Sequence, residues 1–107
     1  MTRHPPTLSE LAEIYLSTRN LKAKTEHGYR GVLDRCVPDW YDLPVDKITK
    51  QMILERHQQL SKTGRIQANY CMRILRALYN FGIEYFENED DKPVIVSNPV
   101  RKLSRLT

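Results

Sequence analysis

Residues 65–86, RIQANYCMRILRALYNFGIEYF, decide the fold of this chain. Apolar residues recur there at every third or fourth position, a spacing that predicts one buried face of an α-helix. At 1.5 Å per residue this helix is about 33 Å long, which is enough to cross a small domain. The stripe that we expect to face the core consists of Ala68, Cys71, Met72, Leu75, Leu78, Gly82 and Tyr85.

Three further helices are predicted before this segment. Thr7 and Glu10 form a capping box at the start of a helix over 8–19, in which a threonine hydroxyl and a glutamate each bond the other's backbone amide. Thr25 is predicted to cap a second helix over 26–36, which Pro38 ends. Thr49 is predicted to cap a third helix, which ends near Gly64. The sequence therefore predicts an all-α fold, an orthogonal bundle of four to five helices.

Two other features of these segments bear on packing. Trp40 and Leu43 lie in the proline-containing loop 37–47 and are expected to plug the core. Gly28 and Gly31 weaken the second helix by about 1 kcal/mol each relative to alanine. We therefore expect a partner backbone to approach this helix closely, in compensation.

Composition limits the class of protein. The chain has 107 residues, 40% of them hydrophobic and 28% charged, which suits one globular domain. No stretch is apolar enough to span a membrane or to serve as a signal peptide. Cys36 and Cys71 lack the spacing of a zinc site, so no metal or cofactor is predicted. A cytoplasmic, reducing location is the default.

Charge is unevenly distributed along the chain. Residues 1–83 carry 13 basic and 8 acidic groups, a balance of +5, and the predicted loop 84–91 carries 5 acidic groups and no base. Residues 92–107 carry 4 basic groups and no acid. A basic body permits binding to nucleic acid, although an ordinary solvated surface would have the same composition.

The long helix also carries a polar stripe opposite its apolar one. Arginine pairs with phosphates or guanine edges and asparagine with adenine, so this stripe is a candidate DNA-contacting face. The alternative is a solvated outer face. The stripe comprises Arg65, Asn69, Arg73, Arg76, Asn80 and Glu84, with Gln67 beside it near the helix start.

A second basic cluster surrounds the start of the second helix: Lys22, Lys24, Thr25, His27 and Arg30. A helix N-terminus with adjacent lysines and a threonine hydroxyl suits a phosphate group. The alternative is that Thr25 only caps the helix and the lysines are solvated. Both roles are compatible.

Catalytic residues are not predicted. The histidines His4, His27 and His57 are far apart in sequence, and no serine lies in a nucleophile elbow. The chain also has no glycine-rich phosphate loop. We expect His57 to lie at the edge of the core, and the two cysteines to be buried thiols.

Several motifs in the same order resemble the N-terminal, SAM-like core-binding domain of the tyrosine recombinase (phage integrase) family. They are Thr7–Leu16, Lys24-Thr25-x-x-x-Tyr29, Asp46-x-Ile48-Thr49, Asn69 with Leu75–Gly82, and Asn98-Pro99. The resemblance covers about residues 7–103. It departs from the family at Gln67, where serine or threonine is usual, and at the acidic insertion 87–91.

The resemblance implies a domain that grips one side of a core recombination site, a double-stranded DNA, through its second and fourth helices. Lys24 and Thr25 match a phosphate-contacting pair, and Asn69 and Arg76 match polar positions of the fourth helix. The implied partners are a catalytic domain of the same parent chain and other recombinase protomers. Residues 1–6 would be a flexible lead, 7–97 the core-binding domain, and 98–107 a linker.

The family's chemistry needs a His-x-x-Arg box and a nucleophilic tyrosine, and this sequence has no His-x-x-Arg. We therefore expect the chain itself not to cleave DNA. Two alternatives remain: a helical protein–protein interaction domain, and a helix-turn-helix regulator. The latter needs a short turn between its helices, which the loop 37–47 does not provide.

Overall fold

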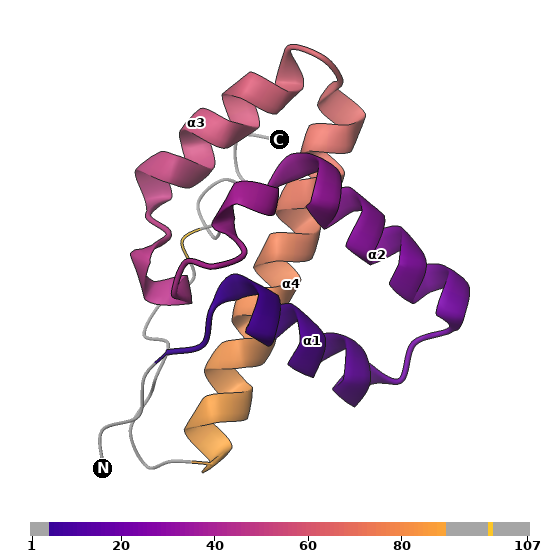
Figure 1. Ribbon diagram of the computed structural model, residues 1–107. Coiled ribbons are helices and arrows are strands. Elements are labelled where there is room, and N and C mark those ends of the chain that lie inside the picture. The colour runs from indigo at the N-terminus through magenta and orange to yellow at the C-terminus, as the bar shows by residue number, and fades with distance from the viewer. Residues whose placement is uncertain (1–4, 90–98, 100–107) are drawn as a thin grey trace.

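The computed structural model describes residues 5–89 and residue 99, and the side chains of 5–85 and 99. Its elements are the α-helices α1 (Leu8–Arg19), α2 (Ala23–Cys36), α3 (Lys50–Ser61) and α4 (Arg65–Glu89). Two short 3-10 turns, η1 (Pro38–Trp40) and η2 (Val45–Lys47), lie between α2 and α3. The described residues form no strand, which confirms the all-α bundle (Figure 1).

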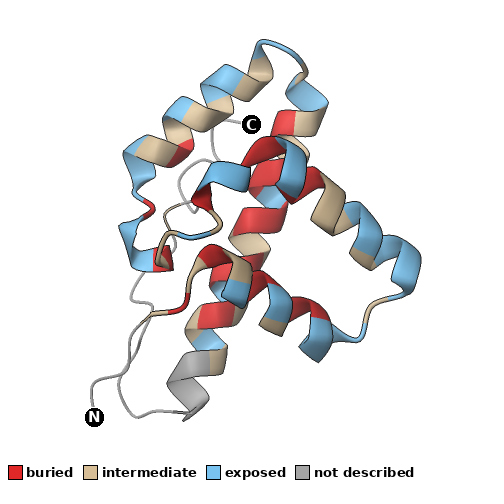
Figure 2. Ribbon diagram, in the orientation of Figure 1, coloured by how far each residue is buried: buried red, intermediate tan, exposed pale blue. Residues whose placement is uncertain are grey.

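Helix α4 is the central element, since it packs against each of the other helices. The predicted apolar stripe is confirmed. Ala68, Cys71 and Leu75 are fully buried, and Leu78 is 1% exposed. Figure 2 shows that the buried residues gather where the helices face one another. The core is therefore organised along the segment whose periodicity is strongest.

The starts of α1 and α3 are closed by threonine caps, as the sequence predicts. Thr7 Oγ1 accepts the Glu10 amide at 3.3 Å, and Glu10 Oε1 accepts the Thr7 amide at 2.9 Å. The Thr7 amide and then the Thr7 hydroxyl, which lies 3.0 Å from Glu10 Oε1, donate to the Glu10 carboxylate and hold its pKa below its ordinary value. Thr49 Oγ1 accepts the Met52 amide at 3.2 Å. In this cap the Met52 sulfur, in place of the glutamate found in α1, accepts the Thr49 amide at 3.5 Å. Both caps are thus confirmed.

The start of α2 differs from the prediction. The helix begins at Ala23, its N-cap residue is Lys22, and no side chain caps it. Thr25 lies within the first turn and is not the cap, so that prediction was wrong. The physical reason is local: the Lys22 carbonyl already accepts the Glu26 amide at 3.0 Å, and Ala23 and Lys24 are good helix formers.

The glycines of α2 do not serve close packing. A Cβ added at Gly28 would meet no atom within 4 Å, and one at Gly31 would meet only the Arg35 side chain, at 3.4 Å. The predicted approach of a partner backbone was therefore wrong. Both positions lie toward the outside of the helix, whose buried face is formed by Val32, Leu33 and Cys36.

The loop between α2 and α3 closes one end of the core. Trp40 and Val45 are buried and Leu43 is half-buried, as expected for residues that plug the core. The loop backbone pairs with the start of α1, where the Leu8 amide donates to the Leu43 carbonyl at 3.0 Å. From α4, the Tyr79 hydroxyl donates to the Val45 carbonyl at 2.7 Å. These bonds make the loop an ordered part of the bundle.

The acidic segment is helical in its first part. Because α4 continues to Glu89, residues 84–89 are not the loop that the sequence predicted, and the predicted helix end at 86 was too early. The proposed linker 98–107 lies outside the described residues, apart from Pro99. No described helix is long and apolar enough to cross a membrane.

Candidate nucleic-acid interface

The start of α2 presents the first group of candidate residues. Lys22, Lys24, Thr25 and His27 are all exposed. Since Lys22 is the N-cap residue and its side chain does not cap the helix, the amides of the first turn have no side-chain acceptor from that position. Cations and amides therefore face the solvent together, an arrangement that suits a phosphate group.

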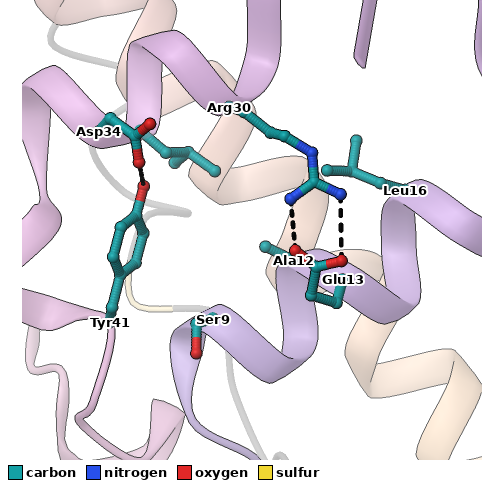
Figure 3. Close-up of a pocket in the computed structure, with 8 residues that line it drawn as sticks. Ser9, Ala12, Glu13, Leu16, Arg30, Asp34 and Tyr41 are labelled. Atoms are coloured by element: carbon teal, nitrogen blue, oxygen red, sulfur yellow. Dashed lines mark hydrogen bonds and ion pairs between the residues drawn. The ribbon is translucent and has the colours of Figure 1, made fainter. Parts of the chain in front are cut away.

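Arg30, the fifth residue predicted in this group, is placed differently. Its guanidinium bonds both carboxylate oxygens of Glu13 on α1, and the Nη2–Oε2 distance is 3.0 Å (Figure 3). A second carboxylate, that of Glu26 one turn earlier on α2, places its Oε1 3.6 Å from Arg30 Nη2. The bond from Arg30 lowers the pKa of Glu13. Arg30 thus joins α1 to α2, and its charge is already paired.

A cleft of about 240 Å³ lies beside this ion pair, between α1 and α2. Tyr41 closes one side of it, and its hydroxyl donates to Asp34 Oδ1 at 2.5 Å (Figure 3). Burial, and then this hydrogen bond, raise the pKa of the Tyr41 hydroxyl. The polar groups of the cleft are therefore largely bonded to one another.

The outer face of α4 presents the second group. Arg65 and Arg73 are exposed and make no ion pair with any residue of the described part. Asn80 and Glu84 are also exposed, whereas Arg76 is half-buried. The predicted polar stripe therefore faces solvent at most of its positions, and its freest cations lie in the N-terminal half of the helix.

Asn69 and Gln67 lie at the edges of this face. Asn69 is half-buried, and its Oδ1 lies 2.8 Å from His57 Nε2 on α3. Because a carbonyl oxygen can only accept, Nε2 carries the proton and donates. Bidentate pairing of an asparagine with adenine uses both Oδ1 and the amino group, so it would require this bond to break. The Gln67 Nε2 atom is buried and has no hydrogen-bond partner among the described residues.

A ring contact connects the two groups. The rings of Tyr29 on α2 and Tyr70 on α4 meet edge to face, with centroids 6.4 Å apart. Lys24 lies about 7.5 Å before Tyr29 along its helix, and Arg73 lies about 4.5 Å after Tyr70. The structure therefore does not join the two groups into one cluster, but places them on neighbouring helices within the length of one DNA turn, about 34 Å.

Sequence reasoning missed two residues of interest. Ile66 at the start of α4 is 88% exposed, although it is a large apolar residue. The sequence could have indicated this exposure, because Ile66 lies two helical turns before Arg73 and therefore on the polar side of the helix. Arg56 was also missed: it bonds the Cys36 carbonyl at 2.8 Å and the carboxylate of Asp39. The partners of Arg56 are 17 and 20 positions away in the chain, so no local sequence pattern indicates these contacts.

Other chemistry finds little support in the described residues. No group of three His, Cys, Asp or Glu side chains lies close enough there to hold a metal ion. Cys36 and Cys71 are buried, as predicted, and burial raises the pKa of the Cys71 thiol. His57 is half-buried at the edge of the core, also as predicted.

Comparison with known proteins adds no family to this description. The chain matches no protein-family model, no curated protein and no solved structure.

Proposed function

We propose that this chain is a DNA-binding module of a site-specific tyrosine recombinase, whose helices α2 and α4 approach the major groove of a core recombination site. One observation carries the contact with DNA: exposed cations without ion pairs in the described part occupy the start of α2 and the outer face of α4. They are Lys22, Lys24, Arg65 and Arg73. The motif resemblance supplies the recombinase class.

The pairing of charges narrows the proposed contact set. Arg30 is neutralised by Glu13, and Asn69 is bonded to His57, so neither is ready to contact DNA as it stands. Lysines at an uncapped helix start are suited to phosphate, which carries no sequence information. Arg73 on the outer face of α4 is suited to a guanine edge. We therefore assign positioning to α2 and base recognition to α4.

Titration with duplex DNA at several salt concentrations tests the proposal. With about four phosphates neutralised, the logarithm of the binding constant should fall with the logarithm of salt at a slope of roughly −3 to −4. A binding constant that does not depend on salt would remove the electrostatic basis of the proposal. It would favour a protein–protein interaction domain instead.

A matched pair of variants locates the contact. Lys24→Ala should weaken binding to every sequence about equally, since a phosphate contact does not distinguish bases. Lys50→Ala is the control: Lys50 is also exposed in the first turn of a helix, but the start of α3 lies on the opposite side of the bundle from the start of α2 (Figure 1). Equal losses in the two variants would place the contact elsewhere.

The catalytic domain of the proposed recombinase would lie in the rest of a longer parent chain, and this chain alone would not cut DNA. A tyrosine nucleophile needs cationic groups around the developing phosphate charge and a positioned base. Incubation with a suicide core-site duplex should therefore yield no covalent protein–DNA adduct. An adduct would overturn the assignment of this chain to binding alone.

A further inference from the structure

Ile66 is the exposed large hydrophobic residue of the described chain, with 88% of its surface accessible. It lies directly after the turn Lys62–Gly64 and the first residue of α4, Arg65. Helical side chains lean toward the N-terminus of their helix, so Ile66 projects over this turn and away from the core. No packing role within the described bundle explains an isoleucine there.

The surroundings of Ile66 are cationic. Lys62 and Arg65, four and one positions before it in the chain, are exposed, and Arg73 is exposed two turns further along the same side of α4. A surface of this kind repels a basic partner and attracts a polyanion. An apolar side chain within it is suited to a polyanion that offers an apolar group between its charges.

Double-stranded DNA offers one such group in its major groove, the C5-methyl of thymine. Phosphates and sugars flank this groove, and the other base edges present there are hydrogen-bond donors and acceptors. We propose that Ile66 contacts a thymine methyl group and so determines specificity for thymine at one position of the site. The inference rests on the proposed DNA-binding function and names the base that the start of α4 recognises.

Deoxyuridine provides the test, because it pairs as thymine does and lacks only the methyl group. A site is first enriched from a randomised duplex library, and each thymine in it is then replaced by deoxyuridine in turn. For the unmodified protein, one replacement should weaken binding about fourfold, the worth of one buried methyl group. Fluorescence anisotropy at fixed salt measures the ratio of the two binding constants.

The variants then assign that ratio to a side chain. Ile66→Ala should bind the thymine and deoxyuridine duplexes equally, whereas Ile66→Val should retain part of the ratio. Arg65→Ala is the matched control: it removes a cation from the same surface and no group assigned to the thymine methyl, so it should weaken binding to both duplexes and leave the ratio unchanged. Because both side chains are exposed, all of these variants should fold, which circular dichroism checks.

Each further outcome is distinct. Binding to DNA with a ratio of one at every thymine, or a ratio that survives in Ile66→Ala, overturns the assignment of Ile66 and leaves the proposed function standing. Failure to bind any duplex overturns both proposals. A dimer of the unmodified protein that Ile66→Ala abolishes would assign this side chain to a protein contact and would also overturn the inference.

Discussion

The guanidinium carbon of Arg56 lies 4.5 Å from the centre of the Trp40 ring. The same group donates to the Cys36 carbonyl at 2.8 Å and to the two Asp39 oxygens at 2.8 and 2.6 Å. The pKa of Arg56 is raised by its bonds to Asp39. One side chain of α3 thus holds the end of α2, the η1 turn and the indole that plugs the core.

Removing this side chain should destabilise the bundle. Arg56→Ala should lower the free energy of unfolding by about 2–3 kcal/mol, because it loses a charge-assisted bond to a carbonyl and a cation–π contact. Arg56→Lys should recover only part of this, since an ammonium group cannot bond Asp39 bidentately. Urea denaturation followed by fluorescence of Trp40, the only tryptophan, measures both.

Lys50→Ala is the control, because Lys50 is an exposed residue of the same helix. It should change the free energy of unfolding by less than about 0.5 kcal/mol. Similar urea midpoints for Arg56→Ala and Lys50→Ala would contradict the role given to Arg56.

Acid should weaken the fold through bonded carboxylates. The pKa values of Glu10 and Glu13 lie below the ordinary 4.5, owing to Thr7 and Arg30 respectively, and Arg56 similarly lowers that of Asp39 from 3.8. As pH falls, these carboxylates are protonated in the unfolded chain before they are protonated in the folded one. Their stabilisation is therefore complete above their pKa values in the unfolded chain, and it is lost as pH falls through their lower pKa values in the folded chain. The urea midpoint should therefore decline below about pH 4.5.

The decline should be shallow, because the Glu13 and Asp39 side chains are 60% and 59% exposed and solvent screens their ion pairs. The double variant Glu10→Gln, Glu13→Gln keeps the shapes and removes two titrating groups, so its midpoint should vary less with pH. An equal slope in the variant would show that other groups control acid unfolding.

The two thiols should report global unfolding. Cys36 is 3% exposed and Cys71 is fully buried, and burial raises the pKa of Cys71, so its reactive thiolate is scarce at neutral pH. Native protein should react with iodoacetamide at least about a hundredfold more slowly than protein unfolded in urea. Mass spectrometry counts the modified thiols. A native rate within tenfold of the unfolded rate would indicate that the α2–α4 contact opens locally.

Local signals predicted much of the fold. The periodicity of α4 and the caps at Thr7 and Thr49 depend on residues within a few positions of one another, so the sequence alone reveals them. The prediction at Thr25 failed because two good helix formers, Ala23 and Lys24, precede this threonine. The helix therefore begins at Ala23, before the residue that would have capped it.

The candidate site was less predictable, because its residues are sorted by tertiary contacts. Arg30 and Lys24 look alike in the sequence, yet Arg30 faces a carboxylate of α1 and Lys24 faces solvent. Asn69 likewise belongs to the polar stripe of α4, but the packing of α3 supplies it with His57. Such pairings depend on how two distant segments are placed together, which neither segment encodes.

The bond between Asn69 and His57 leads to the last prediction. Asn69→Ala removes the acceptor of the His57 proton and should lower the free energy of unfolding by about 0.5–1.5 kcal/mol. In a double-mutant cycle with His57→Ala, the coupling should be of the same size, because the residues share one bond. Urea denaturation of the two single variants and the double variant provides the cycle.

The same variant separates structural support from base recognition. On DNA, Asn69→Ala should leave the ratio of the affinities for an enriched site and for random duplex unchanged, since its Oδ1 is occupied by His57. Arg73 is exposed. Arg73→Ala should reduce the binding free energy by about 1–3 kcal/mol more on the enriched site than on random duplex, as expected for a lost contact to a base edge. If Asn69→Ala instead lost discrimination and showed no coupling to His57, its amide would bind a base and the bond to His57 would open on DNA.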